Sequence, residues 1–152
     1  MKRDRFRTEG NCVMTRFDKI RFFVPVAEAA MADWRTRRIC LPSITTALAI
    51  IGTDWGSAAV YREYQCLFPL RHDGIHSHET VSDAVRSHNE YLATWRGAGQ
   101  QNPNWEDLGK EYYILAAQCL QSAAYPYSQD ETFEGRIVEL VERYGLTAYD
   151  VM

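Results

Sequence analysis

The stretch LPSITTALAIIGTDWGSAAVY, residues 41–61, constrains the fold more than any other part of the sequence. Ser43 follows Pro42 and is a candidate N-cap, and the apolar residues after it run to Gly52. The sequence therefore predicts a short helix between Ser43 and Gly52. Ser57 begins another short helix that ends near Tyr64. This stretch predicts two helices separated by only a few residues.

Helical patterns also cover most of the remaining chain. From Asp18 to Trp34 the apolar residues recur with a helical period, and Pro25 predicts a kink in that helix. Further helices are expected from residue 80 or 82 to 95, over 104–121 and over 132–144, with irregular segments at 67–79 and 97–104. Six helices and little strand predict one mainly α domain, of the α+β class once a short N-terminal hairpin is included.

The N-terminal 17 residues do not follow the helical pattern. In RFRTEGNCVMTRF, residues 5–17, two short alternating runs flank Glu9, Gly10 and Asn11. Gly and Asn tolerate the backbone conformations of a tight turn, so this segment predicts a β-hairpin. We expect two parts of the chain, a basic hairpin arm at residues 1–17 and a helical domain at residues 18–152.

The charge is distributed unevenly, although the formal net charge is only −3. Residues 1–38 carry ten basic and five acidic residues, a net +5, whereas the remainder carries seven and fifteen, a net −8. A basic arm on an acidic body favours a polyanion or an acidic protein surface as partner. The candidate partner-binding residues are Arg3, Arg5, Phe6, Arg7 and Arg16.

Composition and spacing exclude several other classes of protein. The four cysteines form no CxxC pair, which favours free buried thiols over structural zinc or disulfides. No apolar run is long enough for a membrane span or a secretory signal, so we expect a cytoplasmic protein with no membrane partner. The segment HDGIHSHE, residues 72–79, matches no established metal spacing, and no phosphate-binding loop is present. No metal and no cofactor are expected.

Several separate stretches carry a resemblance to a known family. SITTALAIIGTDWGSA, CLFPLR, VSDAVRSHNEYL and YSQDETFEGRIVELVERYGLTAYD occur in this order between about Phe17 and Asp150. They resemble the motifs of bacterial peptidoglycan endo-β-N-acetylglucosaminidases of the autolysin and flagellar muramidase type. The resemblance implies a lysozyme-like fold with a sugar groove between two lobes. Only ten residues separate Leu70 from Val81, so the second lobe would be reduced.

The same alignment places a glycine where the family has its catalytic acid. Gly52 stands at the position of the general-acid glutamate, and glycine has no proton to donate to a leaving oxygen. Asp54 and Asp73 are weak substitutes, because Asp54 lies about 200° further around the helix and Asp73 requires a large rearrangement. We expect no catalytic residue and lean towards a protein that is not an enzyme. If it is active, the resemblance implies a glycoside hydrolase of the N-acetylglucosaminidase type.

The groove that the resemblance implies retains some candidate glycan-binding residues. These are Trp55, Phe68, Tyr127 and Asp130, and Trp55 and Tyr127 each have an alternative role in the core. His88, on the matching histidine of the family, is expected to be structural. Pro69 and Arg71 replace the family's glycine and lysine.

Three functions from different classes remain open at this stage. The first is a catalytically inactive, glucosaminidase-like protein that acts by binding: a phage or mobile-element inhibitor or adaptor in the host cytoplasm. Its target would be a protein or a ribonucleoprotein, for example a CRISPR nuclease, met by the hairpin arm or by the groove. The second is an endolysin-type peptidoglycan β-N-acetylglucosaminidase with a rearranged active site, and the third is a glycan-binding module. The missing acid and the added basic arm favour the first.

Overall fold

The structure is a computed structural model that describes residues 14–94, 96–97, 100–101, 105, 108–122 and 126–151. Most of the described residues are helical, which confirms the expected mainly α class. The elements are α2 (Arg16–Arg37), α3 (Pro42–Thr53), α4 (Ala59–Tyr64), α5 (Val81–Ala93), β1 (Arg96–Gly97), β2 (Gln100–Gln101), α7 (Tyr113–Ser122), α8 (Phe133–Arg143) and the 3₁₀ helix η1 (Leu146–Tyr149).

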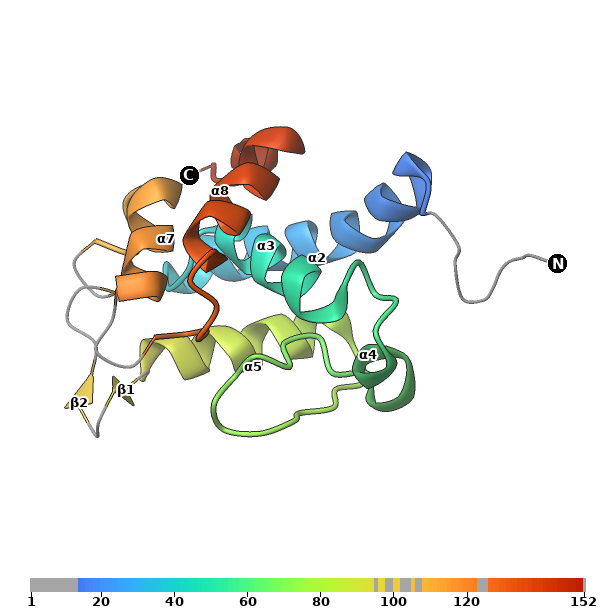
Figure 1. Cartoon of the computed structure of the whole chain (residues 1–152), viewed down its shortest axis with the longest axis horizontal. Helices are drawn as coiled ribbons and strands as arrows, with labels where there is room; N and C mark the ends of the chain where they lie inside the picture. Colours follow the sequence, from blue (N-terminus) through green and yellow to red (C-terminus); the bar gives the residue numbers. More distant parts are fainter. Residues whose placement is uncertain are drawn as a thin grey trace, which may run out of the picture.

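Helix α3 is the centre of the molecule. Ten of its 12 residues are buried, and it contacts α2, α7, α8 and η1. A helix that is apolar on every side requires such enclosure. Figure 1 shows α3 surrounded by the other helices, with α5 along one side of the molecule and α8 along the opposite side. The helix predicted within residues 41–61 is therefore the core around which the others pack.

The start of α3 differs from the sequence prediction. Ser43 is not the N-cap: the helix begins at Pro42, and the N-cap residue Leu41 makes no side-chain capping bond. Instead, the N–H and the hydroxyl of Ser43 donate to the two carboxylate oxygens of Asp150, at 2.8 and 2.6 Å. A carboxylate from the far end of the chain caps this helix, which residues 41–45 alone could not indicate.

Helix α2 begins earlier than expected, and this corrects the end of the predicted hairpin. Thr15 is the N-cap in a capping box: its hydroxyl accepts from the N–H of Asp18 at 3.0 Å, and the Asp18 carboxylate accepts from the N–H of Thr15 at 3.1 Å. Arg16 and Phe17 are therefore helical rather than part of a second strand. The rest of the predicted arm, residues 1–13, lies outside the described residues. The helix continues through Pro25 to Arg37.

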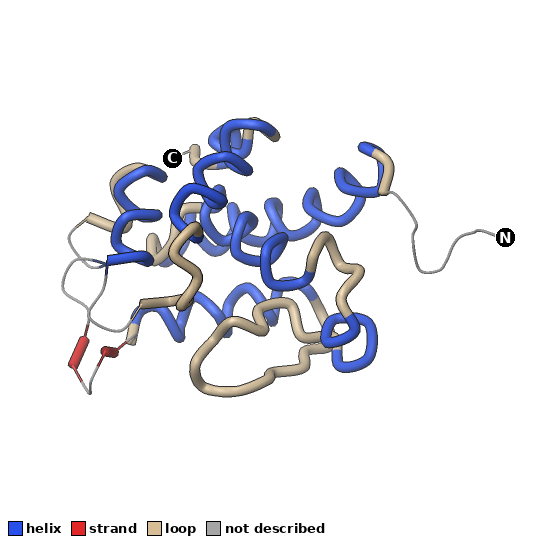
Figure 2. The backbone as a smooth tube through the Cα atoms, viewed as in Figure 1, coloured by secondary structure: helices blue, strands red, loops and turns tan. Residues whose placement is uncertain are grey.

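Helices α5 and α8 each bury one face. In α5 the buried residues include Ala84, Val85, His88 and Leu92, and in α8 they are Phe133, Ile137 and Val141. The loop expected at residues 97–104 includes a two-residue antiparallel pairing of β1 with β2. Figure 2 shows the irregular segment between α4 and α5 as one long loop that runs beside α5.

The long helix predicted from residue 104 is shorter in the structure, because α7 begins at Tyr113. Ahead of it, the ring of Trp105 is buried, and the N–H of Gly109 donates to the carbonyl of Trp105 at 3.1 Å. A Cβ on Gly109 would lie only 2.4 Å from Cε3 of Trp105. Trp105 therefore requires glycine at this turn, and the turn separates Trp105 from α7.

Three of the four cysteines lie within the described residues, and Cys12 lies outside them. Cys40, Cys66 and Cys119 are free and buried, as the sequence predicted. Burial raises the pKa of the Cys40 thiol to about 12, so this thiol stays protonated and unreactive near neutral pH. Within the described ranges, no helix combines the length and the apolar character needed to cross a membrane.

Candidate functional site

The place at which the sequence analysis locates the missing acid lies at the end of α3. A Cβ placed on Gly52 would lie 2.8 Å from Cδ and 3.2 Å from Cγ of Pro69, and 3.7 Å from Cγ of Leu70. Real Cβ atoms do not approach other atoms as closely as the first of these distances. The Pro69 ring therefore occupies the space into which any side chain at position 52 would begin to extend.

Asp54 is directed towards a different side of α3. It is the C-cap residue, with a φ of 49°, and it lines a cavity on the side of α8 together with Ile50, Ile51 and Trp55. The hydroxyl of Ser57 donates to its carboxylate at 3.2 Å. Asp54 therefore does not share a face with Gly52; the helix ends at Thr53, so the left-handed backbone of Asp54 sets its direction rather than a continued helical angle.

Asp73 carries the wrong pKa shift for a proton donor. Arg71 donates to both of its carboxylate oxygens, at 2.9 and 2.7 Å, and His76 lies 3.4 Å away. Burial raises the pKa of Asp73, but the hydrogen bonds and the charge of Arg71 outweigh burial, so the pKa is lowered. A general acid needs a raised pKa to hold its proton near neutral pH. Asp73 is therefore held as a carboxylate.

The four candidate groove residues do not line one surface. Phe68 and Tyr127 are 3% and 1% exposed, so both lie in the core, and neither can contact a ligand from this position. Trp55 is half-buried against Phe23 and Tyr144, and the Lys19 ammonium lies 5.0 Å from its ring centroid. Asp130 precedes α8, where it accepts from Thr132 and Arg136.

Tyr127 belongs to a buried polar network that the sequence did not reveal. Its hydroxyl lies 2.9 Å from Nε2 of His88, whose Nδ1 lies 3.1 Å from Oδ1 of Asn89. Asn89 in turn donates to the carboxylate of Asp33 at 2.8 Å, so the amide oxygen is left to accept from His88. The network thus suits a neutral imidazole protonated at Nδ1. The His88 ring also stacks on Phe68, with ring centroids 4.0 Å apart.

Burial explains why His88 remains neutral. It lowers the pKa of His88 to about 3, since the charged imidazolium would be taken out of water. Burial likewise raises the pKa of the Tyr127 hydroxyl well above its ordinary value. Both groups therefore keep one protonation state near neutral pH, which suits a structural role.

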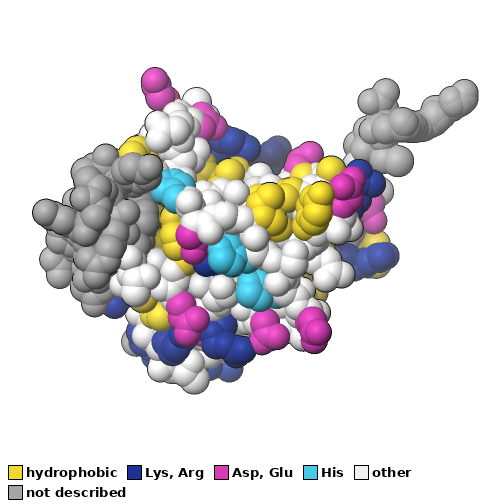
Figure 3. All heavy atoms as spheres, turned by 90° about the horizontal axis from the view of Figure 1, so that it is seen from below, with side chains coloured by type: hydrophobic (Ala, Val, Ile, Leu, Met, Phe, Trp, Pro, Cys, Tyr) yellow, Lys and Arg dark blue, Asp and Glu magenta, His cyan; other side chains and the backbone are white. Residues whose placement is uncertain are grey.

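The histidine-rich segment makes local contacts. His72 donates from Nε2 to the carbonyl of Tyr127 at 2.9 Å, and His76 lies close to Asp73 and stacks with His78. Figure 3 shows histidine side chains on this face beside acidic ones. Within the part of the chain that the structure describes, no three Cys, His, Asp or Glu side chains are placed to hold a metal ion together.

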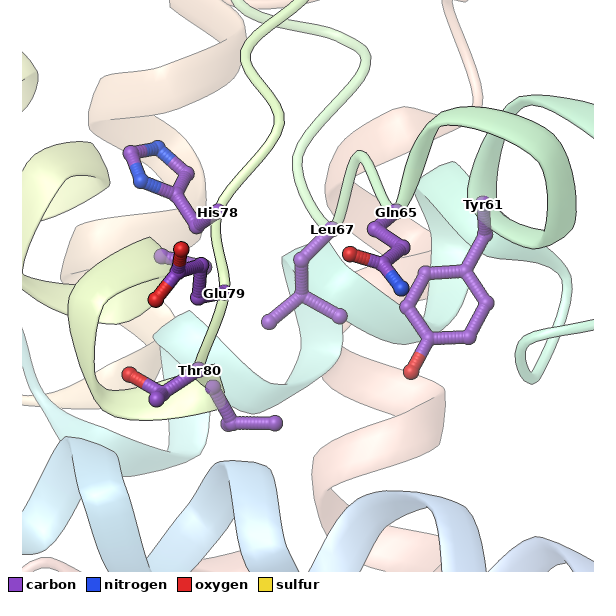
Figure 4. Close-up of a pocket in the computed structure, with 8 residues that line it drawn as sticks. Tyr61, Gln65, Leu67, His78, Glu79 and Thr80 are labelled. Atoms are coloured by element: carbon purple, nitrogen blue, oxygen red, sulfur yellow. The ribbon is translucent and has the colours of Figure 1, made fainter.

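A cavity of about 140 Å³ lies between α4 and the start of α5. Tyr61, Gln65 and Leu67 line one side, and His78 and Glu79 belong to the other. In Figure 4 the His78 ring points away from Gln65 and Tyr61. The polar groups of this cavity therefore do not converge on a common point.

A second cavity, of about 230 Å³, brings two candidate residues together. The end of α3 contributes Asp54 and Trp55 with two isoleucines, and α8 contributes Arg136, Glu139 and Leu140. Arg136 pairs with Asp130 at 2.9 Å, so Asp130 is linked to the same place. Two of the residues selected from the sequence, Asp54 and Trp55, thus line this cavity, on the side of α3 that faces α8.

Comparison with known proteins identifies the fold. No protein-family model and no curated protein sequence matches the chain. The catalytic domain of the autolysin Auto from Listeria monocytogenes matches in structure, with a TM-score of 0.73 and 16% identity over 92% of both chains. The chain has a peptidoglycan-hydrolase-like fold.

Two further solved structures share this peptidoglycan-hydrolase-like fold. An N-acetylmuramoyl-L-alanine amidase from Staphylococcus aureus matches with a TM-score of 0.75 and 14% identity, over 91% of this chain and 45% of its own. A peptidoglycan hydrolase mutant from Sphingomonas sp. A1 matches with a TM-score of 0.57 and 12% identity, over 86% and 96%.

Within the peptidoglycan-hydrolase-like fold, sequence reasoning missed how two substitutions fit each other. Gly52 and Pro69 were each recognised as departures, but their side-by-side packing becomes visible only in the structure. Of the partner-binding candidates, Arg3, Arg5, Phe6 and Arg7 lie outside the described residues. Arg16 is exposed in the first turn of α2, next to Phe17, whose exposure is 63%.

Proposed function

We propose that this chain uses a peptidoglycan-hydrolase-like fold without glycosidase activity and acts by binding a partner. The observation that carries the proposal is the packing of Pro69 on Gly52, where a Cβ would approach Cδ of Pro69 to 2.8 Å. Glycoside cleavage requires a carboxylic acid at the leaving oxygen. At position 52 the chain has neither the acid nor the space for one.

Asp150, a carboxyl group whose pKa is raised, does not replace the missing acid. Burial outweighs the hydrogen bonds that the Asp150 carboxylate accepts from Ser43, so its pKa is raised. Asp150 binds the N-terminal turn of α3, and Gly52 lies nine residue steps beyond Ser43, which at 1.5 Å per step is about 14 Å along the helix. A proton donor at that distance does not replace the missing glutamate.

The proposed partner is a protein or a ribonucleoprotein, bound through the basic N-terminal region. The net +5 of residues 1–38 supports this choice, as do the exposed Phe17 and the Arg21 guanidinium 5.3 Å from its ring centroid. Arg3, Arg5, Phe6, Arg7 and Arg16 are the proposed contacts. For a phage or mobile-element product the place of action would be the host cytoplasm, and a defence ribonucleoprotein such as a CRISPR nuclease is one candidate target.

Cell-wall clearing by a matched set of variants tests the proposal. The wild type, Gly52→Glu, Pro69→Gly, the double variant Gly52→Glu/Pro69→Gly and its amide counterpart Gly52→Gln/Pro69→Gly are compared in a peptidoglycan zymogram. We expect no clearing by the wild type and none by Gly52→Glu alone, because its Cβ would meet Pro69. General acid–base assistance contributes roughly 10²–10⁴ in rate. Clearing by the double variant but not by its amide counterpart would support a cleft that lacks only its acid.

The alternative function is a working hydrolase with a rearranged site, which the shared fold favours. Clearing of cell walls by the wild-type protein establishes that alternative and overturns the proposal. A glycan-binding module is favoured by the half-buried Trp55 at the larger cavity. Titration with chitooligosaccharides, followed by NMR, separates it from a protein-binding role.

A further inference from the structure

We propose that the cavity between the end of α3 and α8 binds an arginine side chain of a partner protein. Ile50, Ile51 and Leu140 form its apolar part, Trp55 supplies an aromatic ring, and Asp54 and Glu139 supply carboxylates. The inference rests on the proposed function only in taking the ligand to be a binding partner. It adds a second, separate contact to the basic N-terminal region.

Asp54 is an exposed carboxylate at a helix end where a negative charge is mildly unfavourable. As the C-cap of α3 it lies at the negative end of the helix dipole, and α3 has no basic residue in its last turn. Among the described residues, Asp54 has the Ser57 hydroxyl as a hydrogen-bond partner and has no ion pair. A cation in this cavity would be stabilised both by the carboxylate and by the helix end.

The carboxylate of Glu139 can also bind a cation that enters the cavity. Glu139 pairs with Arg143 at 3.1 Å, but both side chains are more than half exposed, and such surface pairs are weak and exchange easily. Arg136 also lines the cavity and pairs with Asp130 at 2.9 Å, in an ion pair that is likewise partly exposed. Lys19 lies over the Trp55 ring and 3.4 Å from the Tyr144 hydroxyl, so a guanidinium in the cavity would share this ring with Lys19 or displace it.

The shape and the lining favour arginine over other cations. About 230 Å³ suits one long side chain, whose methylene groups would contact the isoleucines while its planar guanidinium stacks on Trp55. A guanidinium also donates two parallel hydrogen bonds to one carboxylate, which an ammonium group cannot do.

The backbone holds Asp54 and Trp55 in a conformation that L-residues rarely adopt. Asp54, Trp55 and Gly56 have successive φ values of 49°, 61° and 84°. Tryptophan in the left-handed region is costly, and such strain tends to occur at binding sites. Together with the unpaired carboxylate, it supports a binding role for this turn.

The test is an NMR titration of the full-length protein that follows the indole N–H of Trp55, assigned with Trp55→Phe. The probe is the peptide acetyl-Gly-Arg-Gly-amide, and the matched control replaces arginine by citrulline, which has the same shape without the charge. We expect a saturable shift in the millimolar range with the arginine peptide and none with the citrulline peptide.

The variants separate loss of binding from loss of folding. Asp54→Asn removes the charge, and asparagine is better suited than aspartate to the C-cap and equally tolerant of positive φ, so the variant should melt at or above the wild-type temperature. We expect it to weaken binding of the arginine peptide about tenfold, because a charge-assisted bond is lost. Glu139→Gln should weaken binding less, and Glu63→Gln, on α4, should leave it unchanged.

Three results would overturn the inference. One is a failure of either charge comparison: the arginine peptide binds Asp54→Asn as tightly as the wild type, or the wild type binds the citrulline peptide as tightly as the arginine peptide. Another is a Trp55 shift with chitotriose and none with the arginine peptide, which would make the cavity a glycan site. The third is peptide binding only to the full-length variant with Arg3, Arg5 and Arg7 changed to Gln, which would identify the chain's own N-terminal region as the occupant. The titration does not depend on cell-wall clearing, so either proposal can fail without the other.

Discussion

The side chain at position 88 is an imidazole enclosed by neutral partners. Asn89 and Tyr127 bind its two nitrogens, and the ring of Phe68 covers one face. The sequence indicated a structural histidine here. The structure supplies the reason, because burying the charged imidazolium in this environment would be costly. The consequence is a stability that depends on pH.

Acid should therefore destabilise the wild type through His88. Its folded pKa of about 3 lies below the ordinary value, so the unfolded chain takes up the proton first, and the stability is present above about pH 6.5 and lost as the pH falls towards 3. Between pH 7 and pH 5 the loss from this residue is about 2 kcal/mol. Urea unfolding of the wild type and of His88→Gln at both pH values measures it.

His88→Gln should be less stable than the wild type at pH 7 by about 1–3 kcal/mol, because it loses the stacking and part of the network. Because the variant lacks this imidazole, its stability should fall by about 2 kcal/mol less than that of the wild type between pH 7 and pH 5. Parallel pH dependences of the two proteins would contradict the assignment of a buried neutral imidazole.

Among the elements, helix α3 makes different contacts at its two ends. Its N-terminal turn is bound by Asp150, 107 residues away in sequence from Ser43. Its C-terminal turn meets Pro69 at Gly52 and turns away at Asp54. The sequence placed the helix correctly because its apolar residues and its flanking proline and glycine are local signals, whereas the partners at both ends are distant.

A double-mutant cycle on Ser43 and Asp150 tests the distant cap. Ser43→Ala removes one donor and should cost about 1 kcal/mol. Asp150→Ala leaves the backbone N–H as well without its acceptor and should cost about 1–3 kcal/mol, with Asp150→Asn in between. Urea unfolding should give a coupling energy of about 1 kcal/mol. Additive effects would mean that the two residues do not act together.

For the whole molecule, the fold resembles that of enzymes, whereas the charge distribution favours a binding role. The fold is that of peptidoglycan hydrolases, while the place of the expected acid is filled and the cavity with carboxylates lies on another side of α3. Basic residues are concentrated in the first quarter of the sequence. A scaffold shared with enzymes does not fix their activity, because activity depends on the residues at the site.

The basic N-terminal region should control binding to polyanions. Changing Arg3, Arg5 and Arg7 together to Glu moves the formal net charge from −3 to −9 and removes the charge that draws a polyanion to the arm. We expect the wild type to be retained on a heparin column and the variant to elute at lower salt, with an unchanged far-UV circular dichroism spectrum. Elution of both proteins at the same salt concentration would argue that the arm has no such role.

The sequence by itself determined the helical class, the positions of α2, α3, α5 and α8 and the absence of an acid at Gly52, because periodicity, capping and residue identity are local properties. The tertiary structure decided which side chains meet. Tyr127 and Phe68 have the chemistry of groove residues, yet both are buried against His88 of α5. Tertiary packing likewise decides that Asp54 faces α8 and that Asp150 caps α3. The contacts of a side chain depend on neighbours that are distant in the sequence.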